Sequence, residues 1–92
     1  MTLWDFLKDG YYIYYRNHGE ARDCLRECEK LGFRWMNGER APDYLPVNSK
    51  GCLAMDEDTG RLFARGSFHR YKTVCYVDIL GRDVSDFPVF TY

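Results

Sequence analysis

The feature that most constrains the fold is an amphipathic segment between Asn17 and Gly32. Asn17 is a preferred N-cap residue, and Glu20 three positions later is placed to complete a capping box. Gly32 can take the left-handed conformation that ends a helix. Between them, apolar residues recur at the spacing of one helical face, at Ala21, Cys24, Leu25, Cys28 and Leu31. We therefore expect a helix here whose apolar face must be covered by other elements.

Short runs with the two-residue period of a β-strand lie on both sides of this helix. In the first run, Ile13 and Tyr15 share one face, whereas Tyr12 and Tyr14 share the other. The predicted strands are Tyr11–Arg16, Phe33–Met36, Cys52–Met55, Leu62–Ala64 and Thr73–Leu80. We expect residues 56–60 to form a hairpin turn in which Gly60 takes a positive φ. For residues 3–7, the pattern fits both a short helical turn and an extended lead-in.

This order of elements predicts an α+β fold, with one amphipathic helix packed on a mostly antiparallel sheet of four to five strands. A chain of 92 residues is expected to form a single domain. We place the core at about residues 11–80. Residues 82–92 are predicted to be a C-terminal tail that docks on the body or binds a partner. The sheet face opposite the helix is expected to display alternate aromatic residues, including some of Tyr12, Tyr14 and Tyr76.

The charge and cysteine content narrow the function classes. A formal net charge of -1 and a pI near 6.1 are typical neither of a general nucleic-acid binder nor of a DNA mimic. Neither a signal sequence nor an apolar run long enough to span a membrane is recognisable, so we expect a cytoplasmic protein without a membrane partner. We interpret the four cysteines as reduced core thiols, because their spacing lacks the paired knuckles of a zinc site. We predict neither a metal nor a cofactor.

The segment from Arg61 to Lys72 interleaves cationic and aromatic residues and contains no acidic residue. Arginine suits phosphate oxygens, and aromatic rings stack on nucleobases. The candidate nucleotide-binding or phosphate-binding residues are Arg61, Arg65, His69, Arg70 and Tyr71. The alternative is a solvated hairpin, in which the arginines pair with the acidic residues of the 56–60 turn and the rings fill the core.

A second candidate surface combines the sheet face opposite the helix with the loop from Gly38 to Lys50. Tyrosine and arginine are typical anchors of protein interfaces. The candidate partner-binding residues are Tyr12, Tyr14, Arg40 and Tyr44. The sequence shows no supported arrangement of catalytic residues, so we predict that the protein is not an enzyme.

The stretch from Tyr11 to about Gly38 resembles small uncharacterised proteins encoded in bacteriophages and prophages. The resemblance lies in an aromatic strand, an acidic helix containing Cys-Leu-Arg-Glu-Cys-Glu, and a strand in which Gly32, Phe33 and Trp35 match a Gly-Phe-x-Trp pattern. It extends through the Pro-containing loop, with Pro42 and Pro46, towards Cys75 and Tyr76.

The resemblance implies an accessory protein of the host bacterial cytoplasm that acts in counter-defence. The leading hypothesis is an inhibitor similar to an anti-CRISPR, which occludes a host bacterial defence protein. One alternative is a sponge that sequesters a cyclic nucleotide immune signal and forms a homo-oligomer. A further alternative is a small phage regulator that binds DNA or RNA.

Overall fold

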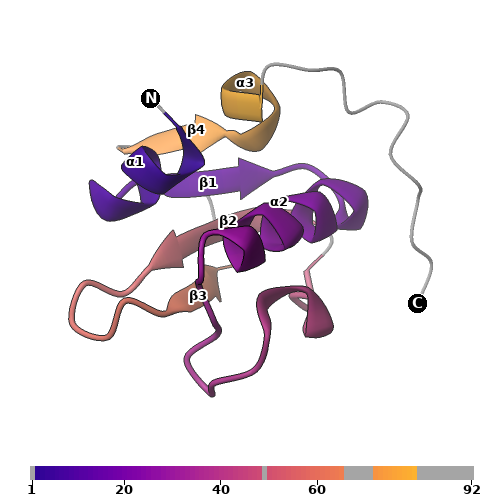
Figure 1. Ribbon diagram of the computed structural model, residues 1–92. Coiled ribbons are helices and arrows are strands. Elements are labelled where there is room, and N and C mark those ends of the chain that lie inside the picture. Colours follow the sequence, from indigo (N-terminus) through magenta and orange to yellow (C-terminus); the bar gives the residue numbers. More distant parts are fainter. Residues whose placement is uncertain (1, 49, 66–71, 81–92) are drawn as a thin grey trace.

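A four-stranded sheet with the order β3-β2-β1-β4 forms the centre of the fold (Figure 1). Its strands are β1 (Tyr12–Tyr15), β2 (Gly51–Met55), β3 (Leu62–Arg65) and β4 (Thr73–Cys75). β1 and β3 are antiparallel to β2, whereas β4 is parallel to β1. The computed structural model describes residues 2–48, 50–65 and 72–80. The α+β class and the mostly antiparallel four-stranded sheet are confirmed, whereas the predicted tail at 82–92 lies outside the described residues.

The long helix α2 (His18–Lys30) begins where the sequence predicts, because the Asn17 Oδ1 atom accepts a hydrogen bond from the Glu20 amide at 2.9 Å. The Glu20 carboxylate reaches back one residue further than a capping box requires and accepts from the Arg16 amide. Residues 3–8 form the helix α1 (Leu3–Lys8), which Thr2 caps. The remaining helices are α3 (Tyr76–Leu80) and the short 3-10 helix η1 (Ala41–Asp43).

The core lies between α2 and one face of the sheet (Figure 1). On the helix, Ala21, Cys24, Leu25 and Cys28 are buried, as the apolar spacing predicts. On the sheet, Ile13 and Tyr15 are buried in the core, whereas Tyr12 and Tyr14 are only half-buried. The predicted alternation of β1 is therefore confirmed, and so is the turn at 56–60, in which Gly60 has a φ of 70°.

The predicted strand Phe33–Met36 is wrong as an element, although its alternation is correct. Phe33 and Trp35 are buried, but the segment makes only isolated bridges, from Arg34 to Arg40 and from Trp35 to Leu62. Gly38, with a φ of 87°, turns the chain away after Met36. The segment therefore cannot continue along β3 for the length of a strand.

The predicted strand Thr73–Leu80 is also wrong, because only its first three residues are extended and the next five form α3. Among the described strands, β4 pairs only with β1, and that pairing ends at Tyr14 and Cys75. Tyr76 is 1% exposed and its hydroxyl donates a hydrogen bond to Asp23 on α2, so it does not lie on the outer sheet face as predicted. Burial and this hydrogen bond raise the pKa of Tyr76.

All four cysteines are free thiols; Cys24, Cys28 and Cys52 are buried, and Cys75 is half-buried. Within residues 2–48, 50–65 and 72–80, no three metal-ligating side chains come together. The helices of the same part of the chain include none that is long and apolar enough to cross a membrane.

Candidate functional site

A groove of about 370 Å³ runs beside the outer edge of β3, which is an edge strand of the sheet. Its floor comes from β3, and its walls come from the turn at Met36 and from the loop that follows η1. We call it the β3 groove and define it by Met36, Tyr44, Val47, Leu62, Ala64 and Arg65. Two distant parts of the sequence therefore meet at one sheet edge.

Exposed apolar side chains gather in the β3 groove. Met36 is 47% exposed, Tyr44 is 45% exposed and Val47 is 88% exposed. These are three of the five large hydrophobic residues that are exposed in the described part of the chain. A cluster of exposed apolar residues marks a binding surface more often than scattered ones do. The groove is therefore the strongest candidate for contact with a ligand or partner.

The loop wall of the groove is fixed to the core by hydrogen bonds. Trp35 Nε1 donates to the Ala41 carbonyl at 2.9 Å, and the Tyr15 hydroxyl donates to the Asn48 carbonyl at 3.2 Å. His18 Nε2 lies 3.0 Å from the Pro46 carbonyl oxygen. The Tyr44 ring packs edge-on against Trp35, with ring centroids 5.4 Å apart. This loop carries the exposed residues on a prearranged surface, which lowers the entropy cost of binding.

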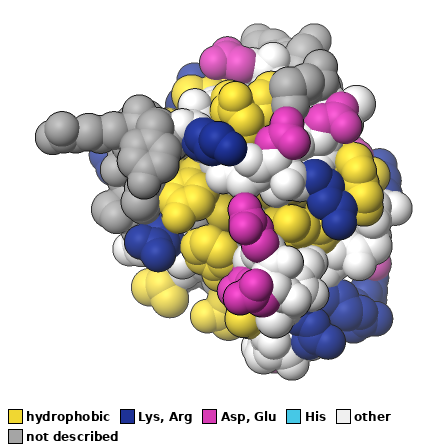
Figure 2. All heavy atoms as spheres, turned by 90° about the vertical axis from the view of Figure 1, so that its left-hand side faces the viewer, with side chains coloured by type: hydrophobic (Ala, Val, Ile, Leu, Met, Phe, Trp, Pro, Cys, Tyr) yellow, Lys and Arg dark blue, Asp and Glu magenta, His cyan; other side chains and the backbone are white. Residues whose placement is uncertain are grey.

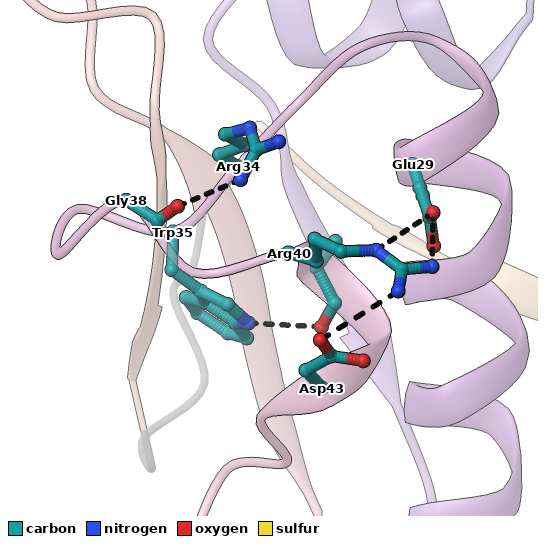
Figure 3. A network of polar contacts seen from close by, with 7 residues as sticks. Glu29, Arg34, Trp35, Gly38, Arg40 and Asp43 are labelled. Carbon is teal, nitrogen blue, oxygen red and sulfur yellow. Dashed lines mark hydrogen bonds and ion pairs between the residues drawn. The ribbon is translucent and has the colours of Figure 1, made fainter.

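An ion-pair network ties Arg40, the residue that precedes η1, to α2 (Figure 3). Arg40 Nη2 lies 2.6 Å from Glu29 Oε1, and Arg40 Nε donates to the same oxygen at 3.1 Å. Asp43 lies on the other side of the guanidinium group, at 3.9 Å. The structure therefore gives Arg40, a predicted partner-binding residue, intramolecular partners that hold η1 against the helix.

The groove has a positive electrostatic bias. Its described lining includes Arg65 and two asparagines but no acidic residue. Next to its Met36 wall, Arg61 Nη1 donates to the Met36 carbonyl at 3.4 Å, and Arg34 Nη1 donates to the Gly38 carbonyl at 2.9 Å. No carboxylate of the described residues forms a salt bridge with Arg34 or Arg61. An acidic partner would therefore be favoured over a basic one.

The opposite face of the sheet carries a smaller aromatic and cationic cluster. Tyr12 and Phe63 pack edge to face, with ring centroids 6.2 Å apart. The Arg65 guanidinium carbon lies 6.0 Å from the Tyr12 ring centroid and 5.8 Å from that of Phe63. This arrangement places an arginine beside two aromatic rings. It brings together Arg65, a candidate for nucleotide binding, and Tyr12, a candidate for partner binding.

The structure divides the predicted site residues among several places. Tyr44 lines the β3 groove, whereas Tyr12 and Tyr14 lie on the opposite sheet face. Arg65 borders the groove on β3 but places its guanidinium group beside Tyr12 on that opposite face. The predicted partner surface is therefore not one continuous patch. Arg61 is exposed next to the groove, and His69, Arg70 and Tyr71 lie outside the described residues. The nucleotide-binding hypothesis, the sequestration of a cyclic nucleotide and the DNA- or RNA-binding alternative stay predictions.

Sequence reasoning missed Met36 and Val47, which are among the most exposed apolar residues of the groove. Val47 lies between Pro46 and Asn48 in a stretch without periodicity, so no repeat marks it as a surface residue. Its position in a loop that carries two prolines and no periodicity is the only available signal. The sequence predicts Met36 as the last residue of a strand, and an exposed residue on one face of a strand does not by itself indicate a binding site.

A second groove of about 440 Å³ lies between α1, the end of α2 and α3. Trp4 and Leu31, which are 38% and 39% exposed, are among its lining residues. Seen from the side that carries α1, hydrophobic side chains gather near the middle of the face among charged ones (Figure 2). No described strand of the sheet lines this groove. Its lining includes both an acidic residue, Glu27, and a basic one, Lys30, so it favours neither an acidic nor a basic partner.

Comparison of the chain with protein-family models, with curated proteins and with solved structures finds no significant match. The resemblance to bacteriophage proteins therefore stays a prediction, and the functional argument depends on the geometry of the site.

Proposed function

We propose that this protein is a non-enzymatic binding protein that contacts a partner protein through the β3 groove. The observation that carries the proposal is the group of exposed apolar side chains Met36, Tyr44 and Val47, the last two on a segment that hydrogen bonds fix to the core. Burying such side chains against a partner supplies binding free energy of about 25 cal/mol per Å² of apolar surface. The fixed wall means that little of this free energy is spent on ordering the loop.

The partner that we propose is a bacterial defence protein, which the bound chain would occlude. This part of the proposal is supported by the predicted resemblance to phage accessory proteins. It also agrees with the kind of site observed, because a stoichiometric inhibitor needs a complementary surface and no reacting groups. The groove offers apolar area, a tyrosine and an arginine, which are typical of energetically important interface positions.

The test measures protection of a phage in bacterial strains that carry single, defined defence systems, each with and without the protein. We expect the protein to raise plaque numbers against at least one defence system. We expect Val47→Asp to abolish this protection, since an unpaired carboxylate in an interface costs about 2 to 3 kcal/mol, or about 30- to 150-fold in affinity. Val47 is 88% exposed, so its substitution should leave the fold unchanged.

Leu31→Asp is the matched control, because Leu31 is also exposed but lines the second groove. It should protect phage as well as the wild-type protein does. If Leu31→Asp abolishes protection and Val47→Asp does not, the partner contact lies in the second groove instead. A lack of protection against every defence system in the panel would contradict the counter-defence role.

A further inference from the structure

We propose that the β3 groove binds an extended acidic segment of its partner, which joins the sheet as an additional strand next to β3. This inference rests on the proposed function and specifies how the partner is held. Peptides often bind proteins by adding a strand to an exposed sheet edge, where main-chain hydrogen bonds supply affinity and side-chain contacts supply specificity. Three features of the β3 edge support this mode.

The first feature is a backbone donor and acceptor at Ala64 that pair with no described residue. In the β2–β3 pairing, Ala64 faces Leu53 and Leu62 faces Met55. The amide and carbonyl groups of Leu62 point away from β2, because they bond to the Arg34 carbonyl at 2.8 Å and to the Met36 amide at 3.1 Å. Residues two apart on a strand point their backbone groups the same way. Those of Ala64 therefore also point outward, and no described residue bonds to them.

The second feature is that the chain itself already pairs with the first part of this edge. Trp35 forms a parallel bridge with Leu62, which shows that the outer side of β3 accepts a strand. The turn at Asn37 and Gly38 then leads the chain away before it reaches Ala64. The groove begins beside this turn and contains the Ala64 position, so an added segment would continue the pairing where residues 34–36 leave it.

The third feature is charge. Arg61, Phe63 and Arg65 alternate with the inward-facing Leu62 and therefore share one face of β3. Acidic side chains on that face of an added strand would meet these arginines, while apolar side chains on its other face would meet Met36, Tyr44 and Val47. A second copy of this chain would instead bring Arg61 and Arg65 against their own equivalents. Charge complementarity therefore favours an acidic partner segment over self-association.

In the experiment, the isotope-labelled protein is titrated with a short peptide in which valine and glutamate alternate. Nuclear magnetic resonance records the backbone amide signals of the protein at each step. The control peptides replace glutamate with lysine, or keep glutamate and carry N-methyl groups on alternate backbone amides. We expect the glutamate peptide to shift the Ala64 amide signal and to bind at least tenfold more tightly than either control. Methylation removes the backbone donors while it leaves the side chains in place.

The variant Ala64→Pro tests the same bond from the protein side. Proline removes the Ala64 donor but not a β2–β3 ladder bond, because this amide points outward, and proline is tolerated at such edge positions. We expect the affinity for the glutamate peptide to fall by about three- to tenfold, the value of one hydrogen bond. The N-methylated peptide gives the same information with the unaltered protein if the variant does not fold.

Equal binding of the glutamate and N-methylated peptides, or no binding of the glutamate peptide, would overturn strand addition. An Ala64 signal that shifts with protein concentration in the absence of peptide would show that a second copy occupies the edge, which also overturns it. None of these three results bears on the loss of phage protection by Val47→Asp. The binding mode and the proposed function therefore fail separately.

Discussion

Tyr15 connects the core to the binding surface at the scale of a single residue. Its ring is 1% exposed and packs under α2, yet its hydroxyl reaches the Asn48 carbonyl in the groove wall. The facing residue on β2 is Gly51, and a Cβ atom there would lie 2.5 Å from the Arg65 carbonyl oxygen and 3.0 Å from the Tyr15 hydroxyl. Glycine is therefore required at position 51 for the strands and this hydroxyl to approach.

Tyr15 should also make the free energy of unfolding depend on pH in the alkaline range. Burial raises the pKa of Tyr15 to about 12, whereas an unfolded chain ionises near its ordinary value of about 10. Between these two values the folded state holds a proton that the unfolded state has released, so its stability falls as the pH rises. We expect the denaturant midpoint to fall from pH 9 to pH 11, and to fall less steeply in Tyr15→Phe.

Tyr11→Phe is the control for this titration, because it removes one tyrosine hydroxyl that is not fully buried. Identical slopes for the wild type and for Tyr15→Phe would show that the Tyr15 hydroxyl is not protected in the folded state.

Among the elements, the joint between β1 and α2 combines a helix start with a buried charge. Glu20 is 1% exposed, and its carboxylate accepts from the Arg16 amide at 3.1 Å and from Arg16 Nε at 2.7 Å. The same residue donates its amide to the N-cap Asn17. This carboxylate therefore fixes the direction in which α2 leaves the sheet.

Removal of the Glu20 carboxylate should cost more stability than removal of an exposed one on the same helix. Glu20→Ala leaves the Arg16 groups without their acceptor, and we expect a loss of about 2 to 3 kcal/mol in the free energy of unfolding. Glu27→Ala breaks an exposed pair with Lys30 and should cost no more than about 0.5 kcal/mol. Urea unfolding measures both values, and equal losses would refute the structural role of Glu20.

The β4–α3 segment shows how tertiary context overrides local pattern. From Thr73 to Leu80 the apolar residues suit a strand, but β1 offers a partner only as far as Cys75. Beyond that point, the helical turn lets Tyr76 bury its ring and reach Asp23 on α2. Helix and strand patterns are hard to tell apart in short apolar runs, so the local sequence does not mark the point at which β4 gives way to α3.

For the whole molecule, the cysteines report on the integrity of the core. Three thiols are buried, and a hydrogen bond to Cys28 together with burial raises the pKa of Cys24 well above its ordinary value. The thiolate is the nucleophile that attacks a thiol reagent, so both effects protect Cys24. Cys24 and Cys28 come from α2 and belong to the core, so their exposure requires the helix and the sheet to separate. Cys52 faces Tyr14 in the β1–β2 pairing and is therefore buried on the opposite sheet face.

Native-state labelling should therefore follow global unfolding. With a maleimide at pH 8, we expect Cys24 and Cys28 to react at one common slow rate and Cys75 to react faster, because it is half-buried. Mass spectrometry of proteolytic peptides resolves the four rates. Glu20→Ala should accelerate the slow group about 30- to 150-fold, in proportion to its loss of stability. Fast labelling of Cys24 in the wild type would contradict a closed core.

The sequence by itself determined the elements whose signals are local. The cap at Asn17, the helical spacing through Cys28, the alternation of β1 and the 56–60 turn each depend on neighbours within a few residues. It also determined the α+β class, because one amphipathic helix and several short strands can bury their apolar faces only against one another.

Tertiary structure alone decided where strands end and which loops meet. Residues 33–36 form only isolated bridges, because the chain turns away from β3 after Met36. Residues 76–80 form a helix, because the pairing with β1 ends at Cys75. The β3 groove brings Tyr44 and Arg65, which are distant in sequence, to one edge, and it adds Met36 and Val47. No periodicity encodes such a meeting, because it follows from how the loop is tied to the core.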